Sequence, residues 1–136
     1  MIALVDASAL YAAADRSDGN HAATLAVLQQ ASLRLVLPAL PLAEAAYLIG
    51  RRLGPGAEAA LARGVADFDM ELPSAADWRR IADLIEQYAD LPLGAADASI
   101  VALAERLGTD LVITLDRRHF SVVRPRHCAA FQLLPE

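Results

Sequence analysis

One stretch, residues 91–120, constrains the fold of this chain more than any other. It predicts a helix over residues 94–107, because Gly108 stands just past its end, where a left-handed residue is common. Residues 111–114 then form a short, unbroken apolar run, which is typical of a parallel strand buried on both faces. A helix that leads directly into such a strand favours an α/β fold.

The rest of the sequence repeats this alternation of short apolar runs and amphipathic stretches. Strands are predicted over residues 2–5, 33–37, 68–72 and 111–114, with a further edge strand over 130–133. Helices are predicted over residues 8–14, 21–31, 38–53, 55–66, 74–88 and 94–107, the first of them capped by Ser8. We therefore expect one domain over residues 1–136, an α/β fold of three layers with a mostly parallel sheet of four to five strands flanked by helices.

Charge and composition exclude several classes of protein. The net charge of −5 provides no overall attraction to nucleic acid, so a nucleic-acid partner must be bound locally. Cys128 is the only cysteine, which excludes an internal disulfide and a thiolate zinc site. No uncharged stretch is long enough to span a membrane, and the amino terminus lacks the features of a signal peptide. These observations favour a cytoplasmic protein.

Four acidic residues stand isolated among apolar ones. Asp6 ends the first predicted strand, and Asp116 lies just past the strand at 111–114. Glu44 and Asp97 lie on predicted helices whose neighbouring residues carry no other charge. Right-handed crossovers bring the carboxyl ends of parallel strands to one edge of the sheet, so we expect Asp6 and Asp116 to lie close together there.

Isolated carboxylates need a source of positive charge. Burying them unpaired is costly, the sequence contains no lysine, and no arginine lies beside Asp6, Glu44 or Asp97. A hard divalent cation such as Mg²⁺ would supply this charge through oxygen ligands, and the three histidines lack the spacing of a zinc site. A competing interpretation treats each acid as a helix cap or surface charge. A receiver-type phosphoryl-transfer domain is disfavoured, because such domains generally use a lysine.

The segments VDASAL, LPLGAADASIVALAERLG and ITLDRRHF, together with the lone Glu44, resemble the PIN-domain nucleases and in particular the VapC toxins of bacterial toxin–antitoxin pairs. The resemblance implies that Asp6, Glu44 and Asp97 are the core acids and that Asp116 is a fourth, more variable one. It implies that the hydroxyls of Ser8 and Thr114 support the metal cluster. It further implies Mg²⁺- or Mn²⁺-dependent cleavage of RNA, a homodimer, and an antitoxin that blocks the site.

Several points remain open at this level. Asp116 could hold a second metal ion or position the attacking water. Arg117 and Arg118 adjoin Asp116 and are the favoured phosphate contacts, although the basic segment could also be a solvated surface. The apolar pair of helices over residues 38–53 and 55–66 has surface to spare for a dimer or an antitoxin. A housekeeping RNA-processing nuclease and a non-catalytic binding module of the same fold are the alternatives to a toxin.

Overall fold

The computed structural model describes residues 1–136 and contains one five-stranded sheet in the order β3-β2-β1-β4-β5. All four strand pairs are parallel. The strands are β1 (Ile2–Val5), β2 (Arg34–Pro38), β3 (Asp69–Glu71), β4 (Leu111–Ile113) and β5 (Gln132–Leu134). The predicted parallel sheet is confirmed, and β1 lies at its centre.

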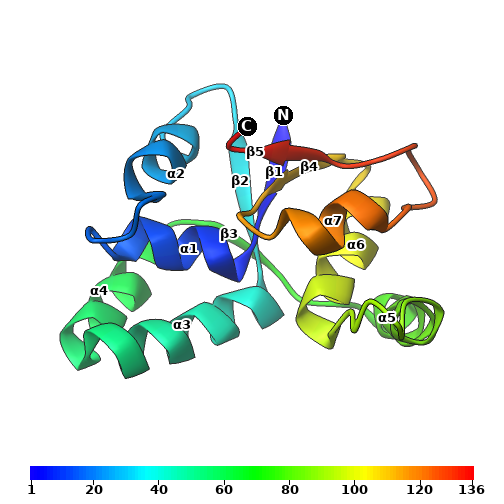
Figure 1. Ribbon diagram of the computed structural model, residues 1–136, viewed down its shortest axis with the longest axis horizontal. Helices are drawn as coiled ribbons and strands as arrows, with labels where there is room; N and C mark the ends of the chain where they lie inside the picture. Colours follow the sequence, from blue (N-terminus) through cyan, green and yellow to red (C-terminus); the bar gives the residue numbers. More distant parts are fainter.

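Seven helices connect and cover the strands. They are α1 (Ala7–Ala14), α2 (His21–Leu28), α3 (Ala39–Leu53), α4 (Pro55–Val65), α5 (Ala75–Gln87), α6 (Ala95–Leu107) and α7 (Arg117–Val122). Figure 1 shows the sheet between two groups of helices, with α1–α4 on one side and α5–α7 on the other. The three-layer arrangement expected from the sequence is therefore present. None of these helices combines the length and hydrophobicity needed to cross a membrane.

The two helical layers bury opposite faces of the same strands. On β1, Leu4 packs in the cluster formed mainly by α5, α6 and α7. Its neighbours Ala3 and Val5 pack in a second cluster with α1, α2 and α3. This alternation follows from the two-residue period of a strand, and it explains why the central strands are apolar throughout.

The helix boundaries follow the capping residues in the sequence. The α6 helix begins after Gly94 and ends at Gly108, which adopts the left-handed conformation with φ of 69°. At the start of α5, Ser74 and Asp77 form a reciprocal capping box, in which each side chain accepts a hydrogen bond from the other's backbone N–H. These ends fix where α5 and α6 lie against the sheet.

Some details of the sequence prediction are wrong. Ser8 does not cap α1: the cap position is Asp6, and Ser8 lies inside the first turn. The α2 helix ends at Leu28, three residues earlier than expected. The short helix α7 (Arg117–Val122) was not predicted, because six residues rich in arginine show no clear apolar period.

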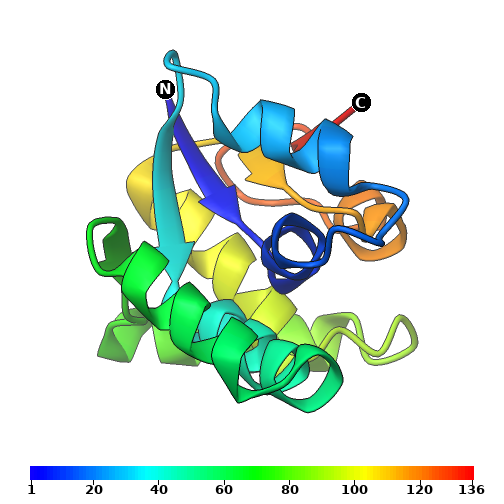
Figure 2. The ribbon, with the colours of Figure 1, turned by 90° about the vertical axis from the view of Figure 1, so that its left-hand side faces the viewer.

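The topology places Asp6 beside the end of β4. Figure 2 shows β1 and β2 running in the same direction, with α1 and α3 beginning where these strands end. Asp6 follows β1 directly, and its backbone N–H donates to the carbonyl of Ile113 at the end of β4. The carboxyl ends of the central strands therefore meet at one edge of the sheet, as expected.

Candidate functional site

A cavity of about 290 Å³ opens at this edge of the sheet. It lies between the end of β1 and the amino-terminal parts of α1, α3 and α6. Its lining residues are Asp6, Ala7, Ser8, Glu44, Leu48, Gly94, Ala95, Ala96, Asp97 and Asp116. The cavity therefore brings together all four acids singled out in the sequence, although they span residues 6 to 116. No lysine or arginine lines it.

Asp6 is held rigidly on one side of the cavity. Its side chain is almost fully buried, and Oδ2 accepts hydrogen bonds from Ser8 Oγ at 2.9 Å and Thr114 Oγ1 at 2.7 Å. Each hydroxyl oxygen in turn accepts a backbone N–H, that of Leu115 for Ser8 and that of Asp116 for Thr114. The hydroxyl protons are thus directed to Asp6, while Asp6 Oδ1 has no hydrogen-bonding partner in the protein.

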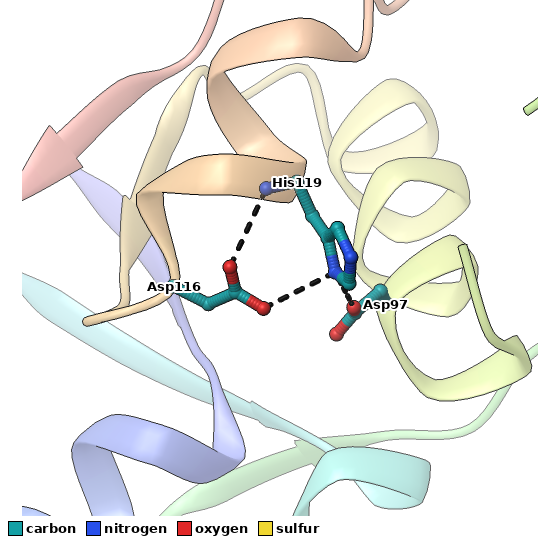
Figure 3. A group of neighbouring side chains, drawn as sticks. All are labelled: Asp97, Asp116 and His119. Carbon is teal, nitrogen blue, oxygen red and sulfur yellow. Dashed lines mark hydrogen bonds and ion pairs between the residues drawn. The ribbon is translucent and has the colours of Figure 1, made fainter. Parts of the chain in front are cut away.

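A second group lies opposite, where α6 meets α7. Figure 3 shows His119 between Asp97 and Asp116, with its Nδ1 atom 2.7 Å from Asp97 Oδ2 and 3.1 Å from Asp116 Oδ2. Asp116 stands at the amino-terminal cap of α7, and its Oδ1 accepts the backbone N–H of His119 at 3.4 Å. One oxygen or nitrogen of each residue lies within 4.8 Å of the others, which is close enough for a shared metal ion.

Glu44 reaches the cavity from α3. It is more exposed than its apolar sequence neighbours led us to expect, and it forms no hydrogen bond or ion pair. Partial burial and the negative charge of Asp6 both raise the pKa of the Glu44 carboxyl. An unpaired acid in this position remains available to an incoming cation.

The pKa of Asp97 reflects its burial and the nearby carboxylates. Burial and the charge of Asp6 raise its pKa to about 6, although the hydrogen bond from His119 works in the opposite direction. A carboxyl with such a raised pKa is poorly compensated by its protein surroundings, because no lysine or arginine lies in the cavity to neutralise it. The electrostatics of the cavity therefore favour a bound cation.

His119 was not predicted from the sequence as a residue of this site. Its ring nevertheless lies among the acids and retains only 12% exposure. The sequence feature that could have identified it is its position three residues after Asp116. An acid at the cap of a helix lies close to the residue one turn later in that helix.

The two arginines next to Asp116 point in different directions. The guanidinium of Arg117 donates a hydrogen bond to the carbonyl of Pro135, near the end of the chain. The guanidinium of Arg118 lies 3.4 Å from Nε2 of His119 and so borders the acid cluster. Both side chains are exposed, and only Arg118 contacts a residue of the cluster.

Comparison with known proteins identifies the family. A model of the PIN domain matches residues 3–124, which is most of the chain. The chain belongs to the PIN-domain family. It is 37% identical over 134 residues to ribonuclease VapC26 of Mycobacterium tuberculosis, an alignment that covers 97% of this chain and 99% of the relative. The resemblance to PIN-domain nucleases seen in the sequence is thereby confirmed.

Solved structures share the fold at lower sequence identity. Mycobacterium tuberculosis VapC20, described as a sarcin–ricin loop cleaving toxin, superposes with a TM-score of 0.78 at 19% identity over 85% of this chain and 90% of its own. VapBC2 from Rickettsia felis, bound to a promoter DNA fragment, gives 0.69 at 17% identity over 98% of each chain. FitAcB from Neisseria gonorrhoeae gives 0.59 at 22% identity, over 88% of this chain and 91% of the other.

Proposed function

We propose that this PIN-domain protein is a metal-dependent endoribonuclease that acts as the toxin of a toxin–antitoxin pair. The observation that carries the proposal is the convergence of four carboxylates on one cavity that no arginine or lysine enters. The relative that is 37% identical over nearly the whole chain is itself named a ribonuclease. The proposed reaction is hydrolysis of an RNA phosphodiester bond by water.

The donor set fits a divalent metal ion. Asp6 and Asp97 are the principal proposed ligands, Glu44 binds directly or through a water molecule, and Asp116 completes the set. Oxygen donors of this kind suit Mg²⁺, and Mn²⁺ is expected to substitute for it. When bound, such an ion lowers the pKa of a coordinated water and stabilises negative charge on the phosphate.

The protein contributes orientation to this chemistry. Ser8 and Thr114 direct their hydroxyl protons to one oxygen of Asp6, which lines the cavity, and leave the other oxygen without a protein partner. We therefore assign these two residues the role of orienting Asp6. Asp116, at the amino-terminal cap of α7, is assigned the role of holding an ion or orienting the attacking water.

Arg117 and Arg118 are the proposed RNA contacts. Both are exposed at the rim of α7 beside Asp116, where a phosphate group in the cavity would be within reach of a flexible guanidinium. Contacts of this kind hold the backbone in register but distinguish little between sequences. We place the larger share of this role on Arg118, because Arg117 is engaged by Pro135.

The proposed partners are an antitoxin and a second copy of the chain. A second cavity of about 330 Å³ lies between α1, α2 and α4 and is lined almost entirely by apolar residues: Leu10, Ala13, Ala14, Leu28, Ala57, Ala60, Leu61, Gly64, Val65 and Phe68. A groove of this composition suits an apolar segment of a partner protein. Co-purification with the product of an adjacent small reading frame tests this part of the proposal.

The decisive experiment incubates the purified protein with total RNA in the presence of Mg²⁺, Mn²⁺ or EDTA. We expect cleavage with either metal, none with EDTA, and none for Asp97→Asn, which removes a proposed ligand but keeps the shape of the side chain. Asp67→Asn is a matched control, since Asp67 is exposed and lies outside the cavity. Cleavage by Asp97→Asn at the wild-type rate would contradict the assignment.

A further inference from the structure

His119 is the one nitrogen donor among the acids of the proposed metal centre. Its Nδ1 atom contacts carboxylates from two different helices, Asp97 on α6 and Asp116 at the start of α7 (Figure 3). The contact at 2.7 Å is the only hydrogen bond formed by the Asp97 side chain. A single ring therefore links two acids that have no other direct connection.

The two nitrogens of this ring face different groups. Arg118 lies 3.4 Å from Nε2, and a guanidinium can only donate hydrogen bonds. Ionised carboxylates can only accept hydrogen bonds, so the Nδ1 atom that faces Asp97 and Asp116 carries a proton. The Nδ1–H group then donates to the carboxylates, and a protonated nitrogen cannot simultaneously coordinate a metal ion.

Asp116 is held by the same residue twice. Its Oδ2 faces His119 Nδ1 at 3.1 Å, and its Oδ1 accepts the His119 backbone N–H at 3.4 Å. Both contacts depend on the first turn of α7, which places residue 119 one turn after the cap. The rotamer of Asp116 is thus set by His119 and by the helix that carries it.

We propose that His119 is a positioning residue, which holds Asp97 and Asp116 in the geometry that binds the metal. This inference rests on the proposed function and deepens it. The imidazole supplies one hydrogen-bond donor, Nδ1–H, that lies within reach of both carboxylates and so holds them near each other.

Two substitutions of His119 test the roles of its two ring nitrogens separately. In His119→Asn the amide nitrogen takes the place of Nδ1, whereas in His119→Gln it reaches toward the place of Nε2. We expect His119→Gln to weaken Mn²⁺ binding, measured by calorimetry, by about 10- to 100-fold, as is typical when an outer partner of a metal ligand is lost. His119→Asn should restore most of the affinity. Thermal unfolding of both variants establishes that each is folded.

Two spectroscopic readouts complete the test without relying on RNA cleavage. Nitrogen NMR of the metal-free protein should show that Nδ1 of His119 carries a proton. Pulsed electron paramagnetic resonance of the Mn²⁺ complex should show no coupling to an imidazole nitrogen. Such a coupling would make His119 a direct ligand and overturn its positioning role.

The outcomes distinguish this inference from the proposed function. If the wild-type protein binds no Mn²⁺, the proposed metal centre itself is wrong. If the wild type, His119→Asn and His119→Gln bind Mn²⁺ equally well, only the role of His119 is wrong. Strong binding by wild type and His119→Asn, with weak binding by a folded His119→Gln, supports both.

Discussion

Two groups of charged side chains in this protein are arranged in opposite ways. At the packing surface between α5 and α6, Arg80 pairs with Glu105 through two hydrogen bonds, and Arg106 pairs with Asp77 at 2.9 Å. In the cavity at the sheet edge, four acids converge and none has an arginine partner. In the first group each acid has an arginine partner within the protein. The acids of the second group have no such partner, so their charge must be neutralised by a bound cation.

The pKa values of the acids express this difference. Burial alone would raise the pKa of Asp77 and Glu105, but hydrogen bonds from arginine and from backbone N–H groups outweigh it and lower both values. Burial and the charge of Asp6 raise the pKa of Glu44 and Asp97, and His119 only partly opposes this for Asp97. The same residue types therefore stabilise the fold in one place and oppose their own ionisation in the other, where a cation can relieve the repulsion.

The largest effect is expected when an arginine is introduced into the cavity, because the acids there would then have a cationic partner within the protein. Leu48 lines the cavity one turn after Glu44 on α3, so Leu48→Arg would place a guanidinium beside the carboxylates. We expect Mg²⁺-dependent RNA cleavage to fall at least about 100-fold, because a permanent internal cation replaces the metal ion and several kcal/mol of transition-state stabilisation is lost. Cleavage assays over a series of Mg²⁺ concentrations measure the effect.

Leu48→Gln is the matched control, since it introduces a polar side chain of similar length without the charge. Its cleavage should remain much closer to that of the wild type. If the two variants lose activity equally, the loss reflects packing at position 48 and the electrostatic contrast is not its cause.

Arg80→Ala removes the ion pair between Arg80 and Glu105. This change leaves Glu105 poorly compensated in a site where both side chains retain only 12–13% exposure. We expect the free energy of unfolding to fall by about 2–3 kcal/mol, somewhat less than for a fully buried pair, because the backbone N–H of Arg126 still donates to Glu105. Denaturant titration measures the loss.

Arg79→Ala provides the comparison for Arg80→Ala. Arg79 is adjacent on α5 but exposed and without an ion pair, so its removal should change stability by no more than about 0.5 kcal/mol. Both variants should retain full cleavage activity per folded molecule. A selective loss of activity in Arg80→Ala would show that the two charged groups are coupled.

The sequence was most informative where chemistry and packing disagree. Asp6, Glu44, Asp97 and Asp116 could be selected because an acid in an apolar segment has no packing explanation, and the structure gathers all four. The strands and the helix end at Gly108 were also readable, since each depends on local rules.

What could not be predicted depends on contacts between distant residues. His119 follows an arginine pair and looks like part of a basic surface, and only the approach of α7 to α6 brings its ring to Asp97. Ser8 has the residue type of a helix cap, but its hydroxyl instead meets Asp6 and lies 3.2 Å from Thr114. The divergence of Arg117 from Arg118 likewise follows from where the carboxyl terminus lies.

The contrast also predicts opposite pH dependences of stability. Without metal, Asp97 has a folded-state pKa of about 6, above its ordinary value of 3.8, so the folded state binds more protons in this range. Stability should therefore decrease as the pH rises from about 4 to about 6, by about 1–3 kcal/mol. Asp77 and Glu105 have lowered pKa values, so their contribution is present above about pH 4 and is lost in stronger acid.

Chemical denaturation at a series of pH values, in EDTA, measures these trends. Asp97→Asn should remove most of the decline between pH 4 and 6, and saturating Mg²⁺ should reverse it by binding the folded state. An identical decline in the wild type and in Asp97→Asn would place its origin elsewhere in the molecule.

The smallest predicted effect concerns the arginines themselves. Arg80 and Arg106 form ion pairs with acids, whereas Arg118 contacts only the ring of His119 and remains available to phosphate. Arg118→Ala should weaken RNA binding a few-fold in EDTA and reduce the slope of log affinity against log salt by about 0.7, the value for one phosphate contact on a single strand. Arg117→Ala should have less effect, because the Arg117 guanidinium donates a hydrogen bond to Pro135, and the double variant should show the largest change.

Fluorescence anisotropy with a labelled RNA measures the slope. Arg79→Ala, which removes an exposed arginine on α5 that does not line the cavity, serves as the charge control. If it lowers the slope as much as Arg118→Ala does, the attraction to RNA arises from total charge, and proximity to the acids confers no special role on Arg118.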